Sequence, residues 1–170
     1  MKLSITARFA ALVCVALSAS AGTSPNDSLP EALRPPAGEV LKLKLLGSGV
    51  QIYRCLDGAW KFLAPDARLS DQTGREVGKH YAGPTWEASD GSKVVGEVKA
   101  HADSPDGRAI AWLLLTAKSA EGTGMFSNIR TIQRLQTTGG QAPQKACDAS
   151  MANQIVPVPY TANYYFYAAP

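Results

Sequence analysis

Short stretches in which apolar and polar residues alternate run through most of the chain. Leucines alternate with Lys42 and Lys44 between residues 41 and 45, which is typical of a half-buried strand. The clearest hairpin joins residues 85–88 to residues 93–100 through an Asp-Gly turn. Other stretches rich in β-branched or aromatic residues cover residues 50–55, 60–63, 109–117, 125–138 and 163–168. We therefore expect about eight short strands and no long amphipathic helix.

Glycine and proline mark the expected breaks between these strands. The Gly47–Gly49 segment has the composition of a tight hairpin turn. Pro157 and Pro159 lack a backbone N–H, so we expect regular pairing of the last strand to begin only after them. Residues 148–154 are expected to form one helical turn. The pattern predicts an all-β fold, an antiparallel sandwich or barrel with at most one or two short helical turns.

The first 21 residues have the three parts of a secretory signal peptide. They combine a basic start, an apolar run over residues 9–17 and the small residues Ala19 and Ala21 at a cleavage site. The apolar run is too short to span a bilayer, so we expect no stable membrane insertion of the mature chain. Residues 1–21 are predicted to be the signal peptide, residues 22–36 a flexible or extended mature N-terminus, and residues 37–170 one β-rich domain. This predicts export to a periplasm or to the outside of the cell.

The charge balance argues against nucleic acid as a partner. The whole chain has 17 basic and 14 acidic side chains. Removal of Lys2 and Arg8 with the signal peptide leaves 15 basic against 14 acidic groups. Binding to nucleic acid or to an anionic membrane needs a clustered excess of basic residues, which this balance does not provide.

Two cysteines remain once Cys14 is removed with the signal peptide. Cys55 and Cys147 are then the only pair in an oxidising compartment, and we expect them to form one structural disulfide. The alternative is a redox-active or metal-binding thiol pair. Such pairs usually show close CxxC-type spacing, which is absent here, so the structural bond is the favoured interpretation.

Catalytic chemistry has few candidates. The chain has two histidines, His80 and His101, with no HxH or HxxxH spacing for a metal, and it lacks a GxSxG nucleophile motif. The remaining enzyme hypothesis is a small secreted hydrolase in which His80 works with Glu87 or an aspartate. We expect no metal and no cofactor.

Aromatic residues are the most suggestive feature of the chain. Rings beside amide and guanidinium groups can form flat platforms for sugar rings or peptide segments. In the last strand, one alternating pair of rings must project away from the core unless both sides of the strand are covered. The alternative is that all these rings belong to the core. The candidate binding residues are Tyr81, Trp86, Tyr160, Tyr165 and Tyr167.

Two arginines suggest a second binding feature. Arg130 and Arg134 are four residues apart in an expected strand, with Ile132 between them. Strict alternation would place both guanidinium groups on one face, where they could grip an extended anionic chain. A solvated face without a ligand is the alternative.

Several motifs in residues 29–168 carry a family resemblance. They are Gln51–Cys55, Gly78–Trp86, Asp90–Ser92, Ala111–Leu115, Ile132–Arg134, Gly139–Gly140 and Tyr160–Tyr167. With these motifs in this order, the chain resembles the domain-of-unknown-function 3455 family. The resemblance implies a small exported protein of bacteria and fungi with paired cysteines and no established activity. It therefore assigns no catalytic residue.

Some fungal members of that family carry a malate dehydrogenase label, which the sequence does not support. The Gly47–Gly49 segment is followed by Ile52 where a dinucleotide-binding turn needs its third glycine, and β-like sequence follows in place of a helix. We therefore exclude an NAD-dependent malate dehydrogenase. The favoured function is a non-catalytic envelope or extracellular module that binds a glycan or protein through an aromatic surface. The hydrolase and a structural coat component are the alternatives.

Overall fold

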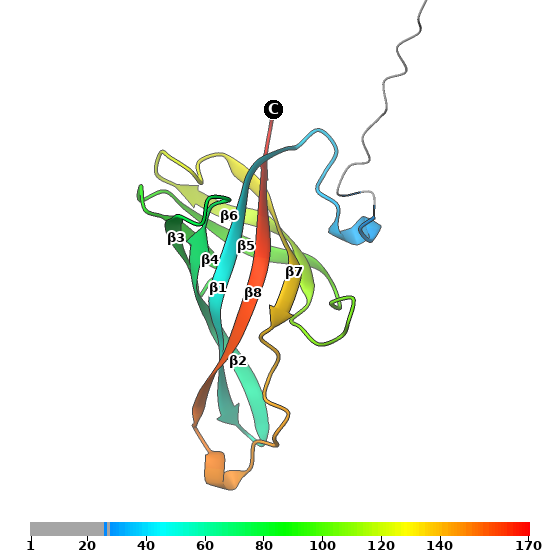
Figure 1. The fold of residues 1–170 in the computed structure, drawn as a ribbon, viewed down its shortest axis with the longest axis vertical. Coiled ribbons are helices and arrows are strands. Elements are labelled where there is room, and N and C mark those ends of the chain that lie inside the picture. Colours follow the sequence, from blue (N-terminus) through cyan, green and yellow to red (C-terminus); the bar gives the residue numbers. More distant parts are fainter. Residues whose placement is uncertain (1–25, 27) are drawn as a thin grey trace, which may run out of the picture.

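The computed structural model describes Asn26 and residues 28–170. In this part of the chain, eight antiparallel strands close into one barrel in which each strand pairs with the next and β8 pairs with β1 (Figure 1). The strands are β1 (Val40–Leu56), β2 (Ala59–Ser70), β3 (Glu76–Tyr81), β4 (Thr85–Ala88), β5 (Lys93–Ala102), β6 (Trp112–Glu121), β7 (Ile129–Gly139) and β8 (Ile155–Ala168). Two short 3-10 turns are η1 (Glu31–Leu33) and η2 (Ala149–Met151).

The predicted all-β fold of about eight antiparallel strands is therefore confirmed. Of the two predicted architectures, a sandwich or a barrel, the structure is a barrel. The hairpin of β4 and β5 and the helical turn near residue 150 lie where the sequence placed them. The part of the chain that the structure describes contains no helix with the length and hydrophobicity of a membrane span. The predicted signal peptide at residues 1–21 lies outside the described residues.

Three strands extend beyond the rest of the barrel. β8 pairs with β1 from Ala168 down to Ile155, whereas its pairing with β7 stops at Tyr160. In the same region, residues 59–66 of β2 pair with β1 alone. The lower parts of β1, β2 and β8 therefore form a three-stranded extension, with η2 at its tip (Figure 1).

The Gly47–Gly49 segment lies within the continuous strand β1, so the predicted hairpin turn was wrong. A Cβ atom at Gly47 would lie 2.6 Å from Cε2 of Tyr164, and one at Gly49 would overlap the carbonyl oxygen of Asp66. Glycine is needed here because an interior ring and the neighbouring strand approach the β1 backbone closely.

Pro157 and Pro159 also lie within a strand, because β8 begins at Ile155. They pair with β1 on one side, while pairing with β7 begins only at Tyr160. The missing N–H of a proline can be tolerated where one edge of the strand has no neighbouring strand. The prediction that regular pairing starts after the prolines was therefore wrong.

Aromatic and aliphatic side chains fill the interior of the barrel. The rings of Trp86 and Tyr164 meet edge to face with centroids 5.5 Å apart, and Trp86 contacts Phe166 in the same way at 5.9 Å. Leu115 and Ile132 are completely buried beside them. An eight-stranded barrel leaves an interior that side chains can fill, so this region is a packed core.

The outer face of the sheet from β5 to β8 is covered by the chain that precedes β1, which we call the N-terminal cover (residues 28–33). Leu33 is fully buried against Tyr165 and Tyr167. The Gln133 side chain connects the two layers, because its Nε2 donates to the Leu33 carbonyl at 2.6 Å and its Oε1 accepts from Tyr167 at 2.8 Å. The last part of β8, from Tyr164 to Ala168, is thus covered on both sides.

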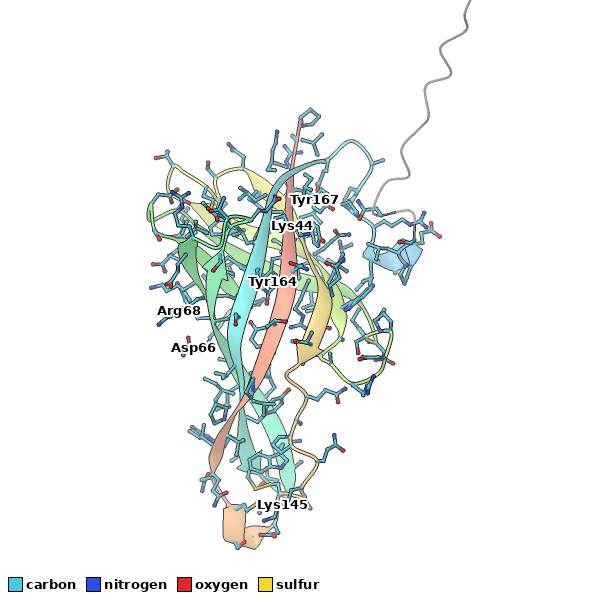
Figure 2. The ribbon with its side chains drawn as sticks, viewed as in Figure 1. Lys44, Asp66, Arg68, Lys145, Tyr164 and Tyr167 are labelled. Carbon is cyan, nitrogen blue, oxygen red and sulfur yellow. A yellow bond between two sulfur atoms is a disulfide. The ribbon has the colours of Figure 1, made fainter. Side chains whose placement is uncertain are left out.

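The predicted disulfide is confirmed between Cys55 at the end of β1 and Cys147 in the loop before η2, with a Cα–Cα distance of 5.5 Å. Nearby, Trp60 Nε1 donates to the carbonyl oxygen of Lys145 at 2.8 Å. Lys145 lies near the lower end of the molecule (Figure 2). The covalent bond and the hydrogen bond together attach the loop after β7 to the three-stranded extension.

Candidate functional site

The aromatic residues expected to form an exposed platform are mostly buried. Trp86 and Tyr160 lie in the core of the barrel, and Tyr165 and Tyr167 lie beneath the N-terminal cover, none of the four more than 9% exposed. Tyr81 is half-buried at the end of β3. Figure 2 shows Tyr167 nearer the upper end of the barrel than Tyr164. These rings form no exposed platform, because two of them belong to the barrel core and two to the contact with the N-terminal cover, and this corrects the expectation of an aromatic surface.

The catalytic candidates His80 and Glu87 lie on opposite faces of the β3–β4 pair. His80 is buried and stacks on Trp86 with centroids 4.5 Å apart. Burial lowers the pKa of His80 to about 3, although the hydrogen bond from Nδ1 to the Thr85 carbonyl, at 2.8 Å, favours the charged form. Glu87 instead accepts a hydrogen bond from the Tyr81 hydroxyl at 2.6 Å. The two side chains do not meet in one pocket, so the predicted acid–base pair is not formed.

The described residues also contain no cluster of side chains that could bind a metal ion. Among Asn26 and residues 28–170, no three His, Cys, Asp or Glu side chains lie close enough together to hold a metal ion. His101 is exposed near the end of β5, while His80 is enclosed in the core.

Arg130 and Arg134 do not share a face of β7. Ile129 pairs with Ala168 and Thr131 pairs with Tyr167, so Arg130 is an extra residue in the strand. A bulge of this kind shifts the alternation by one position. Arg130 is therefore exposed, whereas Arg134 is largely enclosed, and the expected pair of guanidinium groups on one face was wrong.

An open pocket of about 600 Å³ lies where the barrel meets the three-stranded extension, and we call it the barrel-mouth pocket. Arg134 from β7 is the one lining residue that the sequence analysis named as a binding candidate. The others come from β1, β2, β6, the β5–β6 loop and the segment after β7. They are Gln51, Tyr53, Phe62, Asp103, Ala109, Ile110, Ala111, Leu113, Gln141, Ala142 and Gln144.

Arg134 brings a positive charge to this pocket. Its Nε and Nη2 donate to the carbonyl oxygen of Ala111 at 3.1 and 2.8 Å. The hydroxyls of Tyr53, Tyr160 and Tyr164 lie nearby, and burial raises the pKa of each, so these hydroxyls stay neutral. Burial lowers the pKa of Arg134, and interaction with Tyr164 opposes this shift, so the guanidinium remains protonated. Within the described residues, Arg134 forms no ion pair.

Gln51 adds a hydrogen-bond donor without a partner. Its side chain is 2% exposed, and its buried Nε2 makes no hydrogen bond within the described chain. Interaction with this amide lowers the pKa of the Tyr160 hydroxyl, which opposes the larger effect of burial. A buried donor left without a partner costs about 1–3 kcal/mol, so this atom favours an acceptor brought by a ligand or by water.

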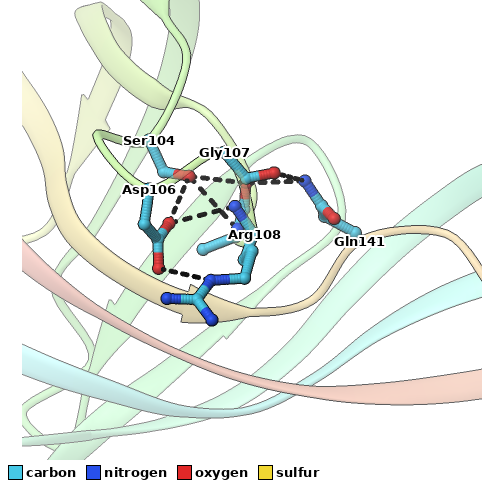
Figure 3. A network of polar contacts seen from close by, with 6 residues as sticks. Ser104, Asp106, Gly107, Arg108 and Gln141 are labelled. Atoms are coloured by element: carbon cyan, nitrogen blue, oxygen red, sulfur yellow. Dashed lines mark hydrogen bonds and ion pairs between the residues drawn. The ribbon is translucent and has the colours of Figure 1, made fainter.

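A polar network holds the β5–β6 loop at the rim of the pocket (Figure 3). Asp106 accepts from the Arg108 backbone N–H at 3.0 Å and from the Ser104 hydroxyl at 3.1 Å. Gln141 Nε2 donates to the carbonyl oxygens of Gly107 at 3.0 Å and Ala109 at 3.2 Å. The rim is therefore preformed and attached to the segment that follows β7.

Comparison with protein families gives a match over most of the chain. A family model described as "Protein of unknown function (DUF3455)" matches residues 36–168. No curated protein and no solved structure matches the chain. The matched range contains every strand of the barrel and all residues that line the barrel-mouth pocket.

Proposed function

The chain belongs to the DUF3455 family, and from its own geometry we propose that it is an exported, non-catalytic binding protein that holds an anionic ligand in the barrel-mouth pocket. The observation that carries this proposal is the Arg134 guanidinium, which lines the pocket without an anionic partner in the described chain. The ligand site of the predicted binding module thus moves from an aromatic surface to this pocket.

A largely enclosed charge favours an anion because water solvates it only partly. A guanidinium has five N–H donors in a planar fork. The Ala111 carbonyl accepts from two of its nitrogens, and an interaction with the Tyr164 hydroxyl occupies at most one more donor. At least two donors are left for a ligand, which matches the two oxygens of a carboxylate.

The shape of the site supports binding of a small molecule or of one group on a longer chain. A volume of about 600 Å³ falls within the range of small-molecule sites, which is roughly 300–1,000 Å³. The network around Asp106 and Gln141 holds the rim in place before any ligand arrives. A preformed rim lowers the entropy lost on binding.

Export remains part of the proposal and has its own support. The signal-peptide pattern at residues 1–21 predicts it, and the Cys55–Cys147 disulfide is typical of an oxidising compartment. Mass spectrometry of the protein recovered from a bacterial periplasm or culture medium tests it. A mature chain that begins at Gly22 is the expected result, and retention of residues 1–21 in the cytoplasm would contradict it.

We expect the substitution Arg134→Gln to remove anion binding. The test compares thermal unfolding of the disulfide-bonded protein in sodium phosphate, sodium acetate and sodium D-glucuronate with unfolding in sodium chloride at equal ionic strength. At least one of the three anions should raise the Tm of the wild type, because a ligand that binds only the folded state stabilises it. The affinity for that anion should fall at least tenfold in Arg134→Gln, because a charged hydrogen-bonding partner is lost.

Arg130→Gln is the matched control, since it removes the same charge from an exposed position on the same strand. It should bind the anion as the wild type does. If Arg134→Gln does not fold, Arg134→Lys replaces it in the test. Lysine keeps the charge but lacks the planar fork, so weaker binding by this variant would also indicate that Arg134 holds the anion. If both position-134 variants bind the anion as tightly as the wild type, or if none of the three anions stabilises the wild type, the proposal is wrong.

A further inference from the structure

We infer that the anion is a sugar acid, a saccharide that carries one carboxylate group. This inference rests on the proposed function and adds the chemical class of the ligand. The geometry behind it is the combination of one guanidinium, one exposed aromatic ring and several amide side chains in the barrel-mouth pocket.

Phe62 provides an aromatic surface at the edge of the pocket. Its side chain is 51% exposed, although it is among the largest apolar side chains of the protein. It meets the Tyr53 ring edge to face with centroids 5.8 Å apart, and the Tyr53 hydroxyl donates to the carbonyl of Gly140 at 2.7 Å. The neighbouring ring is thus held in place, and Phe62 offers a supported flat face of the kind on which the apolar side of a pyranose ring packs.

The polar lining suits hydroxyl groups better than a second negative charge. Gln51 Nε2 is a buried donor that makes no hydrogen bond to any residue that the structure describes, and the amide of Gln144 also lines the pocket. Gln141 uses its Nε2 to hold the rim, which leaves its carbonyl oxygen as an acceptor. Amides that both donate and accept match sugar hydroxyls, which do the same.

Asp103 limits the charge that the ligand can carry. Its exposed carboxylate lines the same pocket as Arg134, and the two form no ion pair. A carboxylate repels a polyanion such as phosphate but accepts hydrogen bonds from hydroxyl groups. A single carboxylate at Arg134 with hydroxyls toward Asp103 satisfies both groups.

Isothermal titration calorimetry on the disulfide-bonded protein tests this inference with matched pairs of sugars. The acids are D-glucuronate, D-galacturonate and N-acetylmuramic acid, and their neutral counterparts are glucose, galactose and N-acetylglucosamine. Cyclohexanecarboxylate and phosphate serve as anions without a sugar ring. We expect at least one acid to bind tenfold or more tightly than its neutral counterpart and than both simple anions.

Phe62→Ala should weaken binding of that sugar acid at least fivefold, because the platform is lost. Leu41→Ala is the matched control, since Leu41 is similarly exposed on β1 and lies outside the pocket. It should leave the affinity unchanged.

The outcomes separate this inference from the function on which it rests. If phosphate or cyclohexanecarboxylate binds through Arg134 as tightly as every sugar acid, the sugar class is wrong and the anion site stands. If no sugar acid binds more tightly than its neutral counterpart and no simple anion binds, both are wrong. Equal binding of sugar acids by wild type and Phe62→Ala would also overturn the inference.

Discussion

At the scale of single residues, the two enclosed basic side chains His80 and Arg134 differ in their protonation state. His80 lies in the core, where burial and the absence of a facing carboxylate among its interactions favour the neutral ring. Arg134 cannot lose its proton within the range of pH at which proteins fold, so it keeps its charge at the pocket. His80 is therefore neutral in the folded protein near pH 7, whereas Arg134 keeps a charge that forms no ion pair within the described residues.

The low pKa of His80 predicts how the free energy of unfolding depends on pH. Its pKa is about 3 in the folded protein and near its ordinary value of 6.5 in the unfolded chain. The unfolded state therefore binds more protons below pH 6.5, and the free energy of unfolding falls as the pH decreases from about 6.5 toward 3. We expect this one group to remove about 1.4 kcal/mol of stability between pH 7.5 and pH 5.5, measured by urea denaturation.

His80→Gln isolates this contribution, because glutamine keeps a hydrogen-bonding group and does not titrate. The variant can be less stable at every pH, so the comparison concerns the change in unfolding free energy between pH 7.5 and pH 5.5. That change should be smaller in His80→Gln by about 1.4 kcal/mol. An identical change in both proteins would mean that His80 is accessible to protons in the folded state.

At the scale of elements, coverage of β8 on both sides explains why this strand is almost entirely apolar or aromatic near its end. The core packs on one face, and the N-terminal cover packs on the other. Two interactions hold the N-terminal cover on the barrel. The Leu33 side chain is fully buried, and Gln133 Nε2 donates to the Leu33 carbonyl at 2.6 Å. The short segment before β1 is thus a structural part of the domain.

Leu33→Ala should release the N-terminal cover. Truncation of a fully buried leucine typically costs about 2–5 kcal/mol, enough to open a short segment held by few contacts. We expect hydrogen exchange at the Leu33-position amide, which is bonded to the Pro30 carbonyl at 2.9 Å, to accelerate at least tenfold. Amides of β3 and β4 should keep their protection, because η1 packs mainly against β5 and β6.

Leu41→Ala, an exposed leucine on β1, is the control and should leave exchange in the cover unchanged. Uniformly faster exchange in all strands of Leu33→Ala would show instead that the cover and the barrel unfold as one unit.

At the scale of the whole molecule, the candidate site exists because a closed barrel and a three-stranded extension meet. Tyr53 and Phe62 come from the extension, Arg134 from the barrel wall, and Gln141 from the segment after β7. The disulfide attaches that last segment to the end of β1. Stability of the extension and shape of the pocket are therefore linked.

Replacement of both Cys55 and Cys147 by serine should destabilise the protein and weaken anion binding. The bond joins residues 92 positions apart, and the loss of its constraint on the unfolded chain costs up to about 4–5 kcal/mol. Urea denaturation measures this loss, and titration with the best anion measures the pocket. Wild-type protein under reducing conditions should reproduce the variant, while unchanged stability and affinity would show that the disulfide is dispensable for both.

Local patterns in the sequence were sufficient for several features. Alternation with a period of two predicts strands wherever one side of a strand is buried, so the β4–β5 hairpin and the all-β fold were correct. The disulfide followed because two cysteines remain once the predicted signal peptide is removed. Each of these conclusions depends on residues that are close in sequence or unique in type.

Features that depend on neighbours distant in sequence were not predictable in this way. A glycine can allow a tight turn, or it can leave room for a neighbouring group that packs against the backbone. Only the contacts of Gly47 and Gly49 with other strands show that they have the second role. The bulge at Arg130 depends on pairing with β8, and it changes which side of β7 Arg134 occupies.

The sequence by itself therefore determined the strand-forming segments, the β class and the cysteine pair, because these follow from local periodicity and composition. The tertiary structure alone decided closure of the barrel, burial of the aromatic rings and assembly of the barrel-mouth pocket. The physical reason is that exposure and charge neutralisation are properties of the space around a side chain. In this protein, that space is bounded by segments between residues 51 and 144 that only the closed barrel brings together.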